Sequence, residues 1–91
     1  MMRFTKNEVN MWFVYVLLCQ DGSFYTGCTN DIEKRFLEHK SGRGGRYTRS
    51  HLPVKIIYKE ELASKSKALK REIEIKSWDR SKKIKDLGLK I

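Results

Sequence analysis

The sequence predicts a small α+β domain with the element order β-β-α-β-α, in which helices flank a three-stranded, mainly antiparallel sheet. Two apolar segments are separated by Asp21-Gly22, a dipeptide typical of a tight hairpin turn. Two later segments have the apolar spacing of amphipathic helices. A third apolar segment lies between those helices, so strands and helices intermingle along the chain, which favours the α+β class.

The hairpin comes first. Residues 12–19 are apolar at both parities, as expected of a strand that is covered on both faces. Residues 24–28 form the second strand. Tyr15 and Tyr25 point to the same face only if the turn has an odd length, and the sequence leaves that register open.

The remaining elements follow from caps and breakers. Thr29-Asn30-Asp31 offers N-caps for a helix that runs to about Lys40. Residues 41–53 hold three glycines and the only proline, so we expect a loop there. Residues 54–60 form the third strand, and Ser64 can cap a second helix. A short extra helix over residues 81–87 is also compatible with the sequence.

The length of 91 residues predicts one domain over residues 1–91, with its core at about 11–78. Residues 1–10 are polar, and we expect them to be flexible. The longest apolar run, residues 11–19, is too short to cross a bilayer, and no secretion signal is recognisable. We therefore expect no membrane association and a cytoplasmic protein whose two cysteines are free thiols. The cysteines and histidines lack the close paired spacing of zinc sites.

The charge balance favours a polyanionic partner. Twenty Lys and Arg residues outweigh eleven Asp and Glu residues, which gives a net charge of +9. Residues 41–59 contain no acidic side chain, and we expect this segment to contact nucleic-acid phosphates and, through its tyrosine, to stack on bases. The predicted contacts are Lys40, Arg43, Arg46, Tyr47, Arg49 and Lys55. A second basic cluster over residues 80–85 is interpreted as a solvated face.

The second helix carries an acid in an unexpected place. With a step of about 100° per residue and Ala68 at zero, Ile75 lies near 340°, Leu69 near 100° and Ile73 near 140°. Glu72 lies near 40°, inside the arc that these apolar residues define, and burying its charge is costly. We therefore expect a partner charge, a metal or a reaction at Glu72. Lys76 follows one turn later, either as a supporting residue or as a simple ion-pair partner.

The first helix repeats the pattern. Ile32, Arg35, Phe36 and His39 form one stripe, and two of these four residues are cationic or titratable. One interpretation places Arg35 and His39 at the rim of the core, with only their apolar parts buried. The other, which the acid on the second helix favours, is a shared polar site beside the sheet.

Together these residues resemble a known family. Phe13-Val14-Tyr15 and, nine residues later, Tyr25-Thr26-Gly27 are similar to the paired signature of the GIY-YIG nuclease superfamily. The segment 28–39 resembles the family's first helix, and Arg71 to Lys76 resembles the helix with its metal-binding glutamate. The resemblance spans residues 11–78 and is closest to the small stand-alone bacterial members. Phe13 replaces the first glycine of the signature, and Val14 and Thr26 replace its two isoleucines.

The resemblance implies a metal-dependent endonuclease that hydrolyses phosphodiester bonds, in DNA rather than RNA. Glu72 would bind a single divalent cation, Mg²⁺ or else Mn²⁺. Arg35 would neutralise charge on the phosphate, and Tyr15 would be the general base. The remaining site residues would be Tyr25 and His39, with Gly27 and Lys76 in support.

The sequence is also compatible with two other functions. The same scaffold could bind nucleic acid with little or no turnover. Alternatively, its basic face could meet an acidic protein. The sequence does not reveal the oligomeric state.

Overall fold

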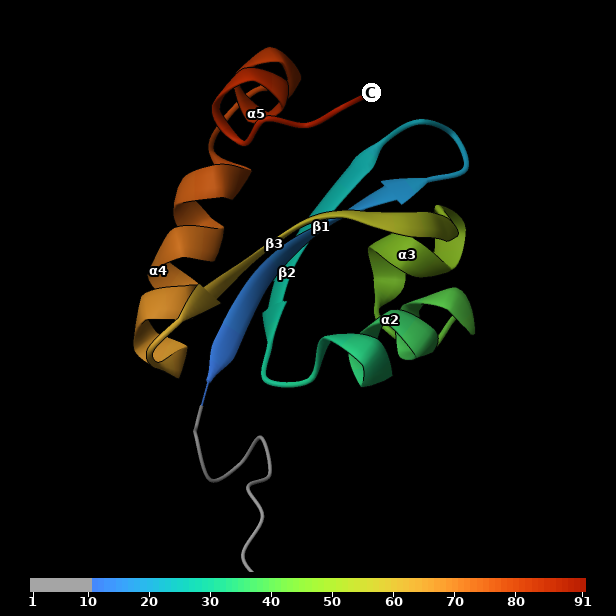
Figure 1. Ribbon diagram of the computed structural model, residues 1–91. Helices are drawn as coiled ribbons and strands as arrows, with labels where there is room; N and C mark the ends of the chain where they lie inside the picture. The colour runs from blue at the N-terminus through green and yellow to red at the C-terminus, as the bar shows by residue number, and fades with distance from the viewer. Residues whose placement is uncertain (1–10) are drawn as a thin grey trace, which may run out of the picture.

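The computed structural model describes residues 11–91 and confirms the α+β class (Figure 1). The expectation that residues 1–10 are flexible lies outside the described residues. Within residues 11–91, seven elements follow one another: β1 (Trp12–Cys19), β2 (Phe24–Thr29), α2 (Ile32–Lys40), α3 (Arg46–Ser50), β3 (Pro53–Leu62), α4 (Lys65–Lys76) and α5 (Arg80–Asp86). None of the helices within residues 11–91 is long and apolar enough to cross a membrane.

The three strands form one antiparallel sheet in the order β2-β1-β3. β1 is the central strand, which explains why it is apolar at both parities. In the hairpin, Tyr15 pairs with Gly27 and Leu17 pairs with Tyr25. Because paired residues and every second residue share a face, this register places both tyrosines on the same side of the sheet.

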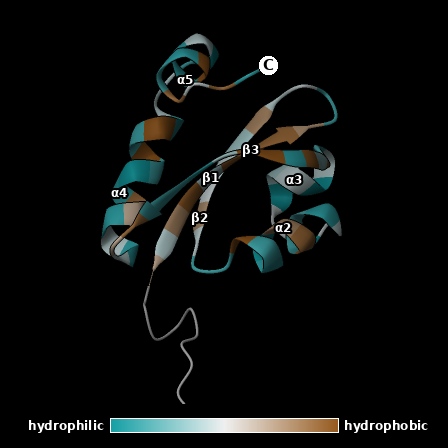
Figure 2. Cartoon of the chain, in the orientation of Figure 1, coloured by the Kyte–Doolittle hydropathy of each residue, from teal (hydrophilic) through white to brown (hydrophobic). Residues whose placement is uncertain are grey.

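Helices cover both faces of the sheet. α4 and α5 lie on one side, and α2 and α3 lie on the other (Figure 1). Val14 packs with Ala68 and Ile75 on the first face. Tyr15 and Leu17 pack on the other face with α2. The side chains of this second cluster are Phe13, Tyr15, Leu17, Tyr25, Ile32, Phe36 and Ile56. In Figure 2 the central strand β1 is mostly brown, and much of the teal lies on the helices, as expected when helices cover both faces of the sheet.

The segment predicted as a loop over residues 41–53 contains a helix, which corrects that prediction. α3 occupies Arg46–Ser50 and begins after Gly45, whose φ of 146° suits a glycine. Its five residues are too few for a recognisable apolar stripe. The third strand is also longer than predicted, because its pairing with β1 runs from Pro53 to Leu62 and bulges accommodate the register shifts.

The phase of α4 differs from the predicted arc. Ala68 and Ile75 are fully buried, whereas Leu69 is 41% exposed and Ile73 is 69% exposed. The helix therefore packs along the narrow line between Ala68 and Ile75, and the two other apolar residues face away from the sheet. Glu72 lies about 50° from this line. It is at the rim of the packed face, and its side chain is 16% exposed.

Candidate active site

Tyr15 lies directly over Gly27 on the face of the sheet that α2 and α3 cover. A Cβ atom added to Gly27 would lie 2.5 Å from the Tyr15 hydroxyl oxygen and 3.1 Å from the Tyr25 ring. The absence of a side chain at this position on β2 therefore makes room for the phenol. The ring centroids of Tyr15 and Tyr25 are 6.4 Å apart, so both phenols enter the same site.

α2 brings His39 to these tyrosines. Asp31 caps the helix by accepting a hydrogen bond from the Lys34 backbone N–H. His39 is fully buried, and its Nε2 atom lies 2.9 Å from the Tyr15 hydroxyl. Its ring centroid is 4.9 Å from that of Tyr25. The predicted convergence of both tyrosines with His39 is therefore present.

The other imidazole nitrogen contacts α3. Nδ1 of His39 lies 2.7 Å from Oγ1 of Thr48, a side chain that is fully buried. Gly44, just before α3, lets the imidazole approach, because a Cβ atom there would overlap the His39 ring. Neither Thr48 nor Gly44 was predicted as a site residue. Their roles depend on α3, and the only signal in the sequence was the cluster of glycines.

Arg35 lies one turn before His39 on α2. Its Nη2 atom donates to the carbonyl oxygen of Gly44 at 2.7 Å, and its Nη1 atom pairs with Oε1 of Glu38 at 2.9 Å. The guanidinium also lies beside the Tyr15 hydroxyl and favours the ionised phenol. About a third of each ion-paired side chain is exposed. The Arg35 charge is therefore held at the surface of the site rather than sealed within it.

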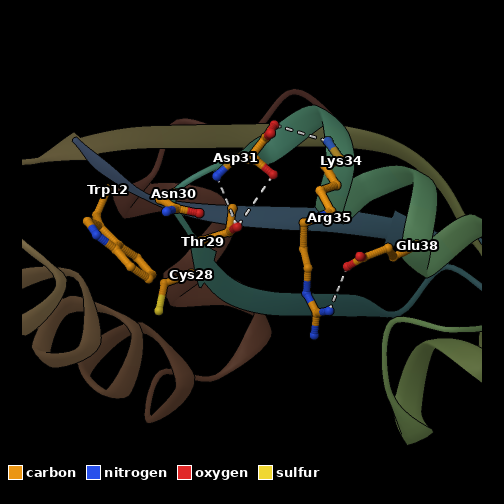
Figure 3. Close-up of a pocket in the computed structure, with 8 residues that line it drawn as sticks. All are labelled: Trp12, Cys28, Thr29, Asn30, Asp31, Lys34, Arg35 and Glu38. Atoms are coloured by element: carbon orange, nitrogen blue, oxygen red, sulfur yellow. Dashed lines mark hydrogen bonds and ion pairs between the residues drawn. The ribbon is translucent and has the colours of Figure 1, made fainter. Parts of the chain in front are cut away.

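A pocket of about 290 Å³ opens beside Arg35. Figure 3 shows Trp12 and Cys28 on one side of this pocket and Arg35 and Glu38 on the other, with Thr29 between them. The pocket gives a solvent route to the guanidinium, which is what an extended anionic ligand requires.

Burial controls the protonation of the site. It lowers the pKa of His39 to about 4, and the nearby Arg35 charge adds to this effect. The imidazole is therefore neutral at pH 7. Burial also raises the pKa of Tyr15 above its ordinary value of 10, and only partial compensation comes from Arg35. The phenol is therefore protonated, and it faces a neutral imidazole.

The predicted shared polar site does not include Glu72, which corrects that prediction, because Glu72 does not lie on this face of the sheet. It projects from α4, which covers the opposite face, and its Oε2 atom lies 2.7 Å from Nζ of Lys76. Burial and then the neighbouring Glu72 raise the pKa of the Cys28 thiol to about 12. Cys28 directly follows Gly27 on the edge strand β2, so the two residues point to opposite faces of the sheet. Glu72 therefore contacts β2 on the face opposite Tyr15. The Lys76 Nζ atom is 5.9 Å from the Tyr25 ring centroid. One edge strand therefore separates the acid from the phenols.

Within residues 11–91, no group of three or more His, Cys, Asp and Glu side chains gathers in a metal-binding arrangement. Cys19 and Cys28 are free thiols.

The predicted nucleic-acid contacts fall into two places. Arg46 and Arg49 are exposed on α3, and Lys40 and Arg43 are exposed just before it. Lys55 instead lies on β3, beside a hollow that Gly88 and Lys90 also line.

Tyr47 extends the aromatic groups of the site along α3. Its ring is 5.9 Å from that of Tyr25 and stacks on His51 at 4.0 Å. The ring is 37% exposed. A flat aromatic surface thus borders the exposed arginines of α3, as expected where bases could stack.

Comparison with known proteins gives consistent matches. The family model described as the GIY-YIG catalytic domain matches residues 11–85. A UPF0213 protein of Staphylococcus saprophyticus is 49% identical over 73 residues, which are 80% of this chain and 89% of that protein. A UPF0213 protein of Bacillus pumilus is 48% identical over 76 residues, which are 84% of this chain and 78% of that protein.

Two solution NMR structures have similar folds. The UPF0213 protein BH0048 of Bacillus halodurans has a TM-score of 0.56 at 38% identity, and the match covers 86% of this chain and 83% of that one. The protein EF2693 of E. faecalis has a TM-score of 0.61 at 40% identity, covering 87% and 84%.

Proposed function

The chain belongs to the GIY-YIG catalytic-domain family, and on that premise we propose that it is a metal-dependent endonuclease that hydrolyses phosphodiester bonds in DNA. The observation that carries this proposal is the buried contact between Tyr15 and a neutral His39, with Arg35 beside the phenol. This arrangement provides a proton path and a phosphate-binding cation in one place.

Tyr15 and His39 would activate the attacking water together. A phenol with a raised pKa is a poor base as long as it keeps its own proton. Because Nε2 of neutral His39 can accept that proton, Tyr15 can take one from water in the same step. The resulting imidazolium is disfavoured by the charge of Arg35. A phosphate bound to Arg35 would offset that charge and lower the cost of the transfer.

Arg35 would bind the scissile phosphate. Its planar guanidinium suits phosphate oxygens, and its present acidic partner is Glu38, an exposed-rim residue that an anion can replace. Tyr25, at the same face, would orient the phosphate or the water. Gly27 would keep the space in which Tyr15 sits.

Glu72 fits a divalent cation of the Mg²⁺ type as a single carboxylate at a partly open rim. Such ions take one or two protein carboxylates, keep several waters and complete their shell with substrate phosphate oxygens. Lys76, which now pairs with Glu72, is 49% exposed and can swing away into solvent. Glu72 neighbours Cys28, and Cys28 lines the same pocket as Arg35. When bound at Glu72, Mg²⁺ or Mn²⁺ would therefore neutralise charge on a phosphate that enters this pocket, and on the leaving oxygen.

The exposed cations on α3 and just before it would bind the phosphates that flank the cleavage position, and Tyr47 would stack on a base. These cations are Lys40, Arg43, Arg46 and Arg49. Only Lys55 lies apart from this surface. The preference for DNA over RNA is part of the proposal.

A second candidate function is nucleic-acid binding without turnover. It is favoured by the position of Glu72, which pairs with Lys76 on the face of the sheet opposite Tyr15. If that pair persists when nucleic acid binds, the basic surface alone would act.

The deciding experiment is cleavage of plasmid, single-stranded and branched DNA with Mg²⁺ or Mn²⁺. The test variants are Glu72→Gln and Arg35→Lys. Glu74→Gln is the matched control, because Glu74 is on the same helix but pairs with Arg71 on its exposed side. The proposal expects metal-dependent cleavage in the parent and the control, and its loss in both test variants.

Salt-sensitive binding without cleavage would replace the proposal with the second candidate function. The absence of binding at low salt would instead point to an acidic protein partner. Cleavage that survives Glu72→Gln would exclude the assigned metal ligand.

A further inference from the structure

We propose that Thr48 is a positioning residue that holds His39 in the Nδ1–H tautomer, so that a bare Nε2 faces the Tyr15 hydroxyl. This inference rests on the proposed function for its catalytic consequence, but the tautomer itself can be measured without substrate.

The first support is the geometry around the imidazole. One hydroxyl contacts each ring nitrogen: Thr48 Oγ1 lies 2.7 Å from Nδ1, and Tyr15 Oη lies 2.9 Å from Nε2. All three side chains are at most 2% exposed. A neutral imidazole has one donor and one acceptor nitrogen. Only the direction of the two hydrogen bonds therefore remains to be assigned.

Arg35 favours one of the two directions, and Thr48 supplies the acceptor that this direction requires at Nδ1. A guanidinium has only N–H donors, and this one lies beside the Tyr15 hydroxyl. The phenol oxygen therefore turns its lone pairs to the cation, and its O–H is directed to the other neighbour, Nε2 of His39. Nε2 must then be the acceptor nitrogen. Nδ1 carries the proton and donates it to Thr48 Oγ1, because the hydrogen bond at one ring nitrogen fixes the tautomer at the other.

The fold makes Thr48 a fixed partner. α3 is joined to α2 by the Arg35 hydrogen bond to the Gly44 carbonyl oxygen, just before the helix begins. Gly44 itself allows the His39 ring to lie against the turn. Arg35 and His39, the two α2 residues next to Tyr15, therefore also contact the segment that carries Thr48.

The chemical consequence concerns one proton. In the Nδ1–H tautomer, Nε2 has a lone pair and can accept the Tyr15 proton while Tyr15 accepts a proton from water. In the opposite tautomer, Nε2 already carries hydrogen and faces the phenol as a donor, so the transfer has no acceptor. Thr48 would therefore act on the reaction only through His39.

The test is the pattern of imidazole ¹⁵N chemical shifts in the full chain, labelled with ¹⁵N-histidine, at pH 7 and without metal or nucleic acid. His51→Gln assigns the signals, because the described residues contain only one other histidine. We expect a protonated Nδ1 and a bare Nε2 on His39 in the parent and in Thr48→Ser. Thr48→Val, which removes the acceptor at similar volume, should move His39 toward the Nε2–H form.

An Nε2–H tautomer in the parent would overturn the proposal, whether or not any variant folds. An unchanged Nδ1–H tautomer in Thr48→Val would also overturn it. For cleavage, we expect Thr48→Val to lower kcat by roughly 10²-fold with little change in KM, and Thr48→Ser to restore most of it. A parent that shows the expected tautomer but never cleaves DNA would refute the proposed function and leave the hydrogen-bond assignment standing. Equal kcat in the parent and in a folded Thr48→Val would refute the positioning role.

Discussion

The Nζ atom of Lys76 lies 2.7 Å from Oε2 of Glu72, one helical turn away and on the face of the sheet opposite Tyr15. The acid that the sequence placed inside an apolar arc is thus neutralised at the rim of α4 by its own helix. Because half of the lysine side chain is exposed, the pair can exchange with another cation at a modest energetic cost.

Glu72→Ala should leave the fold almost as stable as the parent. The helical ion pair contributes about 0.3–0.5 kcal/mol, and the better helix propensity of alanine offsets part of its loss. We expect the free energy of unfolding in urea, without metal, to change by less than about 1 kcal/mol. A loss of several kcal/mol would mean that the pair is a structural element, and the case for a metal ligand at this position would weaken.

Gly27→Ala should damage both stability and activity. The new methyl group would meet the Tyr15 hydroxyl oxygen at 2.5 Å and its Cζ atom at 2.8 Å, inside a packed layer. Such overpacking costs about 1–3 kcal/mol. Because the closest clash involves the hydroxyl, the same substitution in a Tyr15→Phe background should cost less. Urea unfolding of the four proteins of this double-mutant cycle measures the coupling; equal costs in the two backgrounds would contradict the proposed clash.

The stability of the protein should depend on pH through His39. Its folded-state pKa of about 4 lies below the ordinary value of 6.5, so between these values the unfolded chain binds more protons. The stabilisation is complete above pH 6.5 and is lost as the pH falls toward 4, by up to roughly 3 kcal/mol. Urea unfolding of the parent and of His39→Gln between pH 4 and 7 isolates this contribution. A constant difference between the two proteins across that range would contradict it.

Binding of nucleic acid should lose part of its salt dependence when α3 is neutralised. Arg46 and Arg49 are exposed on this helix beside Tyr47. If each contacts one phosphate, Arg46→Gln with Arg49→Gln should lower the slope of log K against log salt by about 1.4 on single strands and about 1.8 on duplex DNA. The control, Lys85→Gln with Lys90→Gln, removes two exposed charges near the C-terminus. Fluorescence anisotropy measures the slope for each double variant. Equal slopes for the two variants would show that the net charge of the protein, and not a phosphate-binding surface on α3, determines the salt dependence.

The fold and most of its elements could be predicted from the sequence because the relevant signals are local. The Asp21-Gly22 turn, the Asp31 and Ser64 caps and the apolar residues of β1 each act within a few residues of their position. The stripe of Arg35 and His39 on α2 was visible for the same reason. Local signals failed for α3, which is too short to have a periodicity.

The sequence by itself determined the residue types of the site and the helices and strands that carry them. It also limited the tyrosines to two possible relative orientations, since side chains alternate along a strand. Only the tertiary structure decided between those orientations, through the pairing of Tyr15 with Gly27. It alone brought Thr48 to His39 and placed Glu72 on the face of the sheet opposite Tyr15. Those relationships join segments that are distant in the chain, and the packing of whole layers sets them, so no local pattern could encode them.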